Sequence, residues 1–324
     1  MNMYSDLIRS NTSLGNVSAA ARSVSIVIAL YNEQQSVREL CSEIACLVDS
    51  LNALEINSEV ILIDDKSTDR TAEIVKQHIA ERNEQLTLVT LRSNTGQVMA
   101  LSLGLSLSSG QYVLVSDGDL QFPLSEAVSM IQSAFEGNDL ICSVRKNNAL
   151  GFLRAFSSNF FGFIARYGVG FPLSEVGCNF RVISRSLLQR CADGNGFVRY
   201  SIMTLAQNAK FVSQKEITVR PRKFGSSTYD FYRLAEFYLD LITDSKKLVI
   251  NGIILSLLFS ILFFLLYVVV RIFCDVQGNY ITAPAQIFML FYLSLIGLVN
   301  IFCMHKLYRI ISKIGYPVVD EIIG

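Results

Sequence analysis

Two aspartates, Asp117 and Asp119, follow directly on a short apolar run at residues 112–116. In the sequence YVLVSDGDLQFP this run stops at Asp-Gly-Asp, and Gln121 comes two residues later. A buried strand that ends in two carboxylates places them at the carboxyl edge of a sheet, where open α/β sheets bind ligands. Two carboxylates this close repel each other unless a cation or a shared proton intervenes. A hard divalent cation that holds a diphosphate resolves the repulsion, whereas an N-cap would explain only one of the two aspartates.

Polar clusters also follow two earlier apolar runs, which we predict to be buried strands. The run at residues 24–30 leads into Glu33, and the run at residues 60–63 ends at two adjacent carboxylates, of which Asp65 is the second. Carboxyl ends of parallel strands lie along one edge, so we expect these clusters to converge on Asp117. Asp65 is placed to accept a hydrogen bond from a ribose or a base, and helix capping is the alternative.

Apolar strands alternate with amphipathic helices of about 10–15 residues between positions 24 and 144, which indicates a mostly parallel sheet covered on both faces. Neither glycine-rich phosphate loop, GxGxxG or GxxxxGK[ST], is present, so a metal and basic side chains must handle any phosphate. The two histidines, His78 and His305, are too far apart in the sequence to indicate a histidine triad or a zinc cluster. Zero net charge gives no support for nucleic-acid binding. Seven scattered cysteines fit reduced thiols.

Two apolar segments near the C-terminus, residues 248–270 and 284–304, each have the length of about 20 residues that a bilayer span needs. The alternative is a pair of long buried helices in a soluble domain. Five basic residues flank the pair and one lies between its members: Lys246, Lys247, Lys306, Arg309 and Lys313 outside, and Arg271 inside. The positive-inside rule therefore predicts a transmembrane hairpin with both ends in the cytoplasm.

Two aromatic-rich amphipathic segments, residues 151–167 and 229–243, read as helices that lie in the membrane interface. Ordinary core helices are the alternative for both.

Four motifs in order, ALYNE, IDDKSTDRT, NTGQVMAL and SDGDLQFP, resemble the family 2 glycosyltransferases of GT-A fold. Within that family the chain resembles the polyprenyl-phosphate glycosyltransferases, which include bactoprenol-phosphate glucosyltransferases and dolichol-phosphate mannose synthase. The resemblance covers about residues 23–247. It implies a Rossmann-like GT-A domain with interfacial helices and a C-terminal transmembrane hairpin. The expected parts are a flexible tail (1–22), a cytoplasmic glycosyltransferase domain (23–228), an interfacial helix (229–247), two transmembrane helices (248–304) and a cytoplasmic tail (305–324).

The resemblance also implies roles for individual residues. Those matching the nucleotide-sugar site are Ala29, Tyr31, Glu33, Ile63, Asp65 and Gly118. Asp117, Asp119 and Gln121 match a site for a divalent cation, Mg²⁺ or Mn²⁺, that holds the diphosphate. With Asp117 and Asp119, the expected catalytic residues include two phosphate-binding arginines, Arg145 and Arg222.

Three further positions match phosphate-binding residues: Arg154, Lys223 and Ser227. The chain departs from the family at Thr228, where a lysine is usual, so Lys223 would have to supply that charge. It departs again at Asn179, the first residue of Asn-Phe-Arg where Asp-Phe-Arg is common, which puts a carboxylate role there in doubt. For Arg181 we expect a structural role.

The expected function is an inverting transfer of a hexose from a nucleotide sugar, UDP-glucose by preference, to undecaprenyl phosphate at the bacterial inner membrane. A lipid phosphate is already an anion near neutral pH, so the reaction needs charge stabilisation more than a general base. GDP-mannose is the alternative donor. A processive polysaccharide synthase would carry Gln-x-x-Arg-Trp, and the chain has no Trp. A non-catalytic, membrane-anchored nucleotide-sugar-binding protein is a third hypothesis, against which the intact Asp117, Asp119 and Gln121 set argues. The expected partners are the nucleotide-sugar donor, the lipid phosphate and the membrane. A homo-oligomer is left open, and nucleic acid is not an expected partner.

Overall fold

The computed structural model describes residues 22–82, 86–146, 178–194, 196–221, 268–269, 272 and 318–323. The chain divides into two compact units, one formed by Met1–Leu241 with Tyr316–Gly324 and the other by Ile242–Gly315. Of the second unit, only three helical residues fall within the described part. The account that follows concerns the first unit.

An eight-stranded sheet forms the centre of this unit, with the order β7-β5-β6-β4-β1-β2-β3-β8. Neighbouring strands from β3 to β4 run parallel, as do β5 and β7, whereas β6 and β8 run antiparallel to their partners. The strands are β1 (Ser23–Leu30), β2 (Asn57–Asp64), β3 (Leu86–Leu91), β4 (Tyr112–Asp117), β5 (Leu140–Arg145), β6 (Arg181–Ser184), β7 (Val212–Ile217) and β8 (Val319–Ile323). The predicted α/β class with a mostly parallel, GT-A-like sheet is confirmed.

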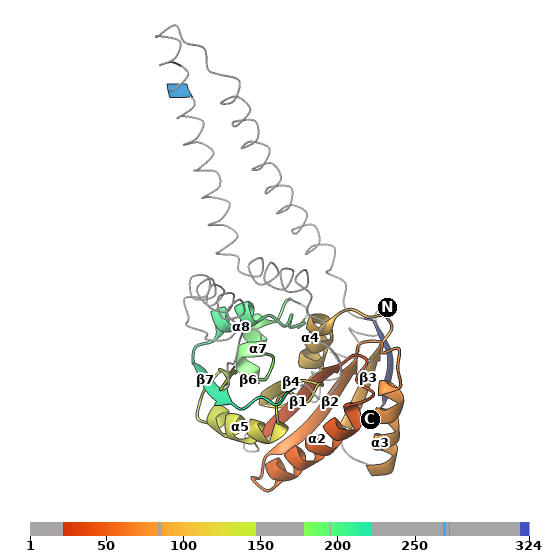
Figure 1. Ribbon diagram of the computed structural model, residues 1–324. Coiled ribbons are helices and arrows are strands. Elements are labelled where there is room, and N and C mark those ends of the chain that lie inside the picture. Colours follow the sequence, from red (N-terminus) through yellow and green to blue (C-terminus); the bar gives the residue numbers. More distant parts are fainter. Residues whose placement is uncertain are drawn as a thin grey trace. The chain divides into compact units, whose positions relative to one another are not determined.

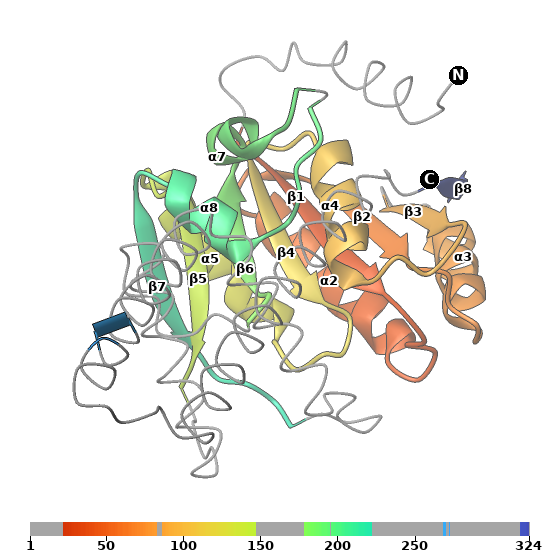
Figure 2. The same ribbon diagram turned by 90° about the horizontal axis from the view of Figure 1, so that it is seen from above.

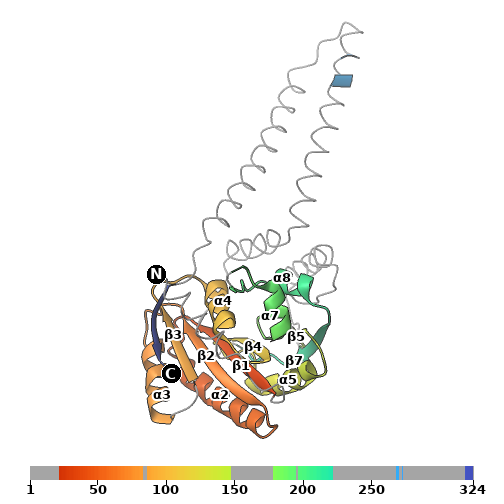
Figure 3. The same ribbon diagram turned by 180° about the vertical axis from the view of Figure 1, so that it is seen from behind.

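Helices cover both faces of the sheet (Figures 1 and 2). The described helices are α2 (Val37–Asn52), α3 (Thr71–Arg82), α4 (Gln97–Leu107), the 3₁₀ turn η1 (Leu124–Glu126), α5 (Ala127–Phe135), α7 (Arg185–Cys191) and α8 (Ile202–Asn208). Figure 3 shows the same layers from behind, with α2, α3 and α5 on one side and α4, α7 and α8 on the other. The apolar residues of α2 recur every three or four positions, so one stripe of this helix is buried against the sheet.

Helix α4 packs very closely on the sheet because a glycine faces it. A Cβ at Gly104 would overlap Cγ1 of Val27 on β1 and would lie 3.3 Å from Cγ1 of Ile63 on β2. Small side chains elsewhere on α4 also let the helix approach, and seven of its residues are buried. This close contact fixes the start of α4, and with it Gln97, relative to the ends of β1 and β2.

The expected C-terminal tail, residues 305–324, ends in a strand that the sequence did not predict. Strand β8 pairs antiparallel with β3, from Leu88 opposite Ile323 to Leu91 opposite Val319. Salt bridges add to this pairing: Lys66 to Asp320 at 3.5 Å, and Lys76 to Glu321. The strand is short and half-exposed at the sheet edge, so it lacks the long apolar pattern from which buried strands are predicted.

The described part of the chain contains no helix long and apolar enough to cross a membrane. The predicted spans, residues 248–270 and 284–304, fall outside the described residues apart from 268 and 269. The predicted interfacial helices at residues 151–167 and 229–243 also fall outside them.

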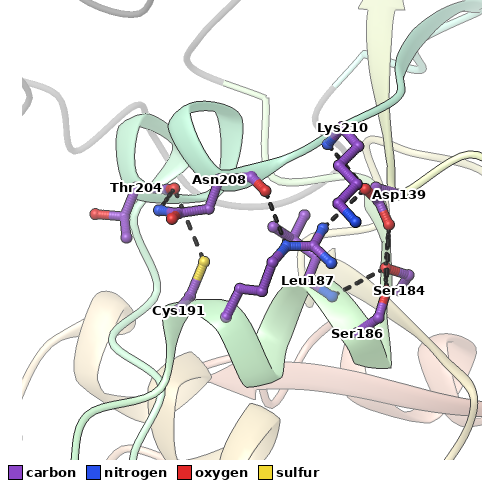
Figure 4. A network of polar contacts seen from close by, with 9 residues as sticks. Asp139, Ser184, Ser186, Leu187, Cys191, Thr204, Asn208 and Lys210 are labelled. Carbon is purple, nitrogen blue, oxygen red and sulfur yellow. Dashed lines mark hydrogen bonds and ion pairs between the residues drawn. The ribbon is translucent and has the colours of Figure 1, made fainter.

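A polar network holds together the edge of the sheet remote from the ends of β1, β2 and β4 (Figure 4). Asp139 precedes β5, and its carboxylate accepts hydrogen bonds from Ser184 Oγ at 2.9 Å and from both Arg190 Nη2 and Lys210 N at 2.8 Å. Burial by itself raises the pKa of Asp139, but the hydrogen bonds from Lys210 and Ser184 and the charge of Arg190 outweigh it and lower the pKa. The ionised Asp139 therefore ties β5, β6, α7 and the start of β7 to one another.

Replacing Asp139 with Asn should destabilise the protein by about 1.5–3 kcal/mol at neutral pH, because charged hydrogen bonds are lost in a buried place. A carboxyl whose pKa is lowered by folding stabilises above its unfolded pKa and loses that effect as the pH falls through its folded pKa. The melting temperatures of wild type and Asp139→Asn should therefore differ at pH 7 and approach each other below pH 3.8, the ordinary pKa of Asp. Asp49→Asn on the exposed side of α2 is the control. Equal melting temperatures at pH 7 would show that the network contributes nothing.

Candidate active site

The strand register brings residues from three strands into one row at the carboxyl edge of the sheet. Ala29 on β1 lies opposite Ile63 on β2 and opposite Asp117 on β4. All three strands are parallel, so the loops that follow them open on the same side. The expected convergence of the polar strand ends is confirmed.

Each of these three loops contains a non-glycine residue in the left-handed backbone conformation. The φ angles are 57° for Asn32, 59° for Lys66 and 60° for Leu120. This conformation costs roughly 1–2 kcal/mol for an L-residue, and Asn tolerates it better than Leu. Leu120 is also buried between Asp119 and Gln121. Strain of this kind concentrates at functional sites, where the surroundings enforce it.

The loops after β1 and β2 are bonded to each other. Asn32 Oδ1 accepts from Thr68 N at 2.8 Å, and Asn32 N donates to Ser67 Oγ at 3.0 Å. Glu33 N donates to Thr71 Oγ1 at 2.8 Å, while the Glu33 carboxylate accepts from a serine on its own loop. Tyr31 on the same loop is 47% exposed, so its ring is available to a ligand. The two loops form one rigid surface beside the row of strand ends.

Asp65 is buried and holds the loop that begins α4. Its Oδ1 accepts from Thr95 N at 2.7 Å and from Thr95 Oγ1 at 3.0 Å, and its Oδ2 accepts from Gly96 N at 2.8 Å. Burial raises the pKa of Asp65, and these hydrogen bonds oppose that rise. Asp65 therefore holds the segment that precedes α4; it does not cap the helix itself, whose N-cap, Gly96, has no side-chain capping hydrogen bond. A direct contact with a nucleotide remains a prediction.

Asp117 ends β4 and is partly buried. Its Oδ1 accepts from Gln97 Nε2 at 2.6 Å and from Asn179 Nδ2 at 3.1 Å. Burial, followed by the negative charge of Asp119, raises the pKa of Asp117 to about 6. Asp119 Oδ1 accepts from Gln121 N at 3.2 Å, which holds this carboxylate in the turn. The two carboxylates repel each other, as their spacing predicted.

Gly118 between the two aspartates lies close to the end of β1. A Cβ there would lie 2.7 Å from Leu30 Cδ2 and 3.4 Å from the carbonyl oxygen of Ala29. A larger residue at this position would therefore require the buried Leu30 side chain to move.

The buried guanidinium of Arg181 is close enough to Asp117 to influence its charge. Arg181 on β6 is 2% exposed and donates from Nη1 to Asn179 Oδ1 at 3.4 Å and to the hydroxyl of Tyr200. The Tyr200 hydroxyl donates to the same Asn179 oxygen at 3.3 Å. The charge of Arg181 lowers the pKa of Asp117 and so opposes part of the effect of burial. From the sequence we expected only a structural role for Arg181, and we assigned no role to Asn179.

Aromatic stacking places Arg145 beside the acidic turn. Phe122 stacks on Phe180 with ring centroids 5.4 Å apart and planes 7° from parallel, and the guanidinium carbon of Arg145 lies 5.7 Å from the Phe122 ring centroid. Arg145 ends β5 and is the predicted catalytic arginine that the structure describes.

The chain also returns to this turn shortly before the predicted phosphate-binding segment. Arg220 N donates to Gln121 O at 2.9 Å, and Glu43 on α2 accepts from both Arg220 Nη1 and Leu124 N. Four predicted site residues lie outside the described residues: Arg154, Arg222, Lys223 and Ser227.

Among the residues that the structure describes, no group of three or more His, Cys, Asp and Glu side chains could hold a metal ion. A pair of carboxylates nevertheless fits Mg²⁺ or Mn²⁺ in a diphosphate site, because Mg²⁺ is usually bound through one or two carboxylates together with substrate phosphates and water. Burial and, after it, the negative charge of Asp119 raise the pKa of Asp117, and such a cation would relieve the repulsion between the two carboxylates.

Comparison with known proteins gives consistent results. Residues 25–192 match the family model "Glycosyl transferase family 2". The undecaprenyl-phosphate 4-deoxy-4-formamido-L-arabinose transferases of Salmonella enteritidis PT4 and Salmonella choleraesuis are each 31% identical over 230 residues, which span 69% of this chain and 68% of theirs.

Solved structures share the fold at lower identity. Glucosyl-3-phosphoglycerate synthase from Mycobacterium tuberculosis, in complex with Mn²⁺, uridine diphosphate and phosphoglyceric acid, has a TM-score of 0.52 at 20% identity, over 72% of this chain and 80% of that one. Mannosyl-3-phosphoglycerate synthase from Rubrobacter xylanophilus has a TM-score of 0.50 at 17% identity, over 74% and 76%. These structures support the fold alone. The family match and the curated relatives together show that the chain is a glycosyltransferase and belongs to glycosyl transferase family 2.

Proposed function

We propose that this glycosyltransferase moves a sugar from a nucleotide donor to undecaprenyl phosphate at the cytoplasmic face of the membrane. The observation that carries the proposal is the Asp117–Asp119 pair, set at the edge where β1, β2 and β4 end and beside Arg145. Relatives that are 31% identical are named undecaprenyl-phosphate transferases, which supports the lipid acceptor.

The donor side would lie over the row formed by Ala29 and Ile63, next to the exposed ring of Tyr31. Glu33, Asp65 and Gly118 would then act through the loops that they hold. We favour UDP-glucose as the donor, with GDP-mannose second. The name of the curated relatives adds nucleotide-linked 4-deoxy-4-formamido-L-arabinose to the candidates.

The chemistry proposed is direct attack of the lipid phosphate on the sugar carbon, with inversion. Asp117, Asp119 and Gln121 would hold a divalent cation, which when bound offsets the charge of the departing diphosphate. Arg145 would face the donor and acceptor phosphates and stabilise the negative charge as it moves between them. An attacking phosphate is already ionised near pH 7, so the site needs no general base.

The acceptor phosphate would be bound by Arg222, Lys223 and Ser227, with Arg154 as a further contact. The hydrogen bond from Arg220 N to Gln121 O supports this assignment, because it brings the chain to the acidic turn two residues before Arg222. The transmembrane hairpin at residues 248–304 and the interfacial helices remain proposals that rest on sequence pattern and charge.

The direct test is transfer by full-length protein in detergent, with undecaprenyl phosphate and a panel of the three nucleotide sugars. One donor should give a glycosylated lipid in the presence of Mg²⁺ or Mn²⁺. Asp119→Asn should abolish this product without lowering the melting temperature, because a neutral amide binds a hard cation poorly. Asp49→Asn is the matched control. Full transfer in excess chelator would overturn the cation site, and failure with every donor would overturn the proposed substrates.

Asp65→Asn should weaken donor binding, because its amide nitrogen would face Thr95 or Gly96 where a carboxylate oxygen now accepts. We expect the Kd for the nucleotide to rise about tenfold, equivalent to about 1.4 kcal/mol, with little change in the KM for the lipid. Calorimetry with the nucleoside diphosphate measures the first and initial rates measure the second. An unchanged nucleotide Kd would mean that the loop at residues 94–96 does not shape the donor site.

The double change Arg222→Ala with Lys223→Ala should have the opposite profile. Each lost charge-assisted contact to a phosphate is worth about 1.5–3 kcal/mol, so lipid transfer should fall steeply while nucleotide affinity stays near wild type. Rates measured across lipid concentrations separate the two effects. Wild-type rates at every lipid concentration would place the acceptor phosphate elsewhere, with Arg145 and Arg154 as the next candidates.

A further inference from the structure

Within the described part of the chain, hydrogen-bond donors contact one of the two carboxylate oxygens of Asp117. Gln97 Nε2 at 2.6 Å and Asn179 Nδ2 at 3.1 Å both donate to Oδ1. None of the described residues donates a hydrogen bond to Oδ2. The two donors come from separate elements, the first turn of α4 and the segment before β6, so they fix both the position and the rotation of the carboxylate.

The direction of the Asn179 amide follows from its other neighbours. Its Oδ1 lies 3.4 Å from Arg181 Nη1 and 3.3 Å from the Tyr200 hydroxyl. A guanidinium can only donate, so the reversed amide would place an NH₂ against Arg181 and an oxygen against the Asp117 carboxylate. Only the observed orientation turns the donating end of Asn179 towards Asp117. An aspartate at this position could not donate unless it carried a proton.

The same helix that carries Gln97 also anchors Tyr200. Tyr200 N donates to Ser102 Oγ on α4 at 2.8 Å, and Val198 N donates to Ser106 Oγ, one turn further along, at 3.1 Å. The contacts thus form a closed path from Asp117 through Gln97 and α4 to Tyr200, and back through Asn179. Because Gly104 seats α4 tightly on β1 and β2, this path has little freedom to move.

We propose that Gln97 and Asn179 are positioning residues that hold Asp117 by Oδ1 and so present Oδ2 to the divalent cation. The inference rests on the proposed cation-binding function of the Asp117–Asp119 pair. It also explains why Asn replaces the usual Asp at position 179, since here the side chain must donate to a carboxylate. Removing a group that orients a metal ligand typically lowers metal affinity about 10- to 100-fold.

The test uses full-length protein in detergent with UDP or GDP present, and measures free Mn²⁺ by electron paramagnetic resonance. Gln97→Met keeps the length of the side chain, adds no charge and removes the donor. Asn179→Leu removes the second donor. Both should raise the Kd for Mn²⁺ about tenfold or more. In transfer assays the KM for Mn²⁺ should rise, while saturating Mn²⁺ restores most of kcat. Gln77→Met on the exposed face of α3 is the matched control and should bind Mn²⁺ as wild type does.

The outcomes distinguish an error in the proposed cation site from an error in the positioning role. If wild type binds Mn²⁺ with neither UDP nor GDP, the cation site itself is wrong, and the positioning role is wrong with it. If wild type binds and Gln97→Met and Asn179→Leu bind equally well, only the positioning role is overturned. Should Asn179→Leu fail to fold, Gln97→Met decides alone, because Gln97 is exposed at the start of its helix. A lower melting temperature with an unchanged Kd would mark either residue as merely structural.

Discussion

The negative charge of Asp117 in a partly buried place beside Asp119 is the constraint that most of the surrounding structure serves. Burial and like charge both favour the protonated acid, and they raise the pKa of Asp117 to about 6. Two neutral amides and the buried guanidinium of Arg181 oppose this shift without neutralising the site completely. The balance leaves a carboxylate that is ionised at neutral pH and still short of positive charge. That is a suitable resting state for the proposed role of Asp117, which is to accept a cation together with the substrate.

The backbone around this carboxylate is stiff where a ligand would need it to be. Left-handed residues follow β1, β2 and β4, and side-chain hydrogen bonds join the first two of these loops. Asp65 fixes a third segment, the start of α4, by accepting three hydrogen bonds. A site organised in this way loses little conformational entropy when it binds. At the opposite edge of the sheet, the hydrogen bonds of Asp139 hold the neighbouring elements together in a similar way.

Sequence reasoning predicted the parts of the fold that depend on local pattern. The strands β1 to β5 and the helices α2 to α5 were expected because apolar runs and amphipathic periods are visible in short windows. Strands β6 and β8 were not expected, since both are short and are defined by antiparallel pairing with strands far away in the sequence. Asp117 and Asp119 were found from their spacing, and their convergence with the polar clusters that follow β1 and β2 was expected from topology. The contacts of Gln97 and Asn179 with Asp117 could not be predicted, because they depend on how closely α4 and β6 approach β4. The positive φ of Leu120 could not be predicted either, because leucine is not a residue type that favours this conformation. For Gln97, the sequence offered only its position within the NTGQVMAL motif.

The edge strand β8 carries a topological consequence. The chain leaves the described part of the catalytic unit at Pro221 and rejoins the same sheet at Val319, beside β3. A backbone that is hydrogen-bonded to one sheet at both ends of an excursion must begin and end that excursion in the same aqueous compartment. If the intervening residues cross a bilayer, they must therefore cross it an even number of times. This conclusion follows from strand pairing alone and is independent of the distribution of lysine and arginine along the sequence.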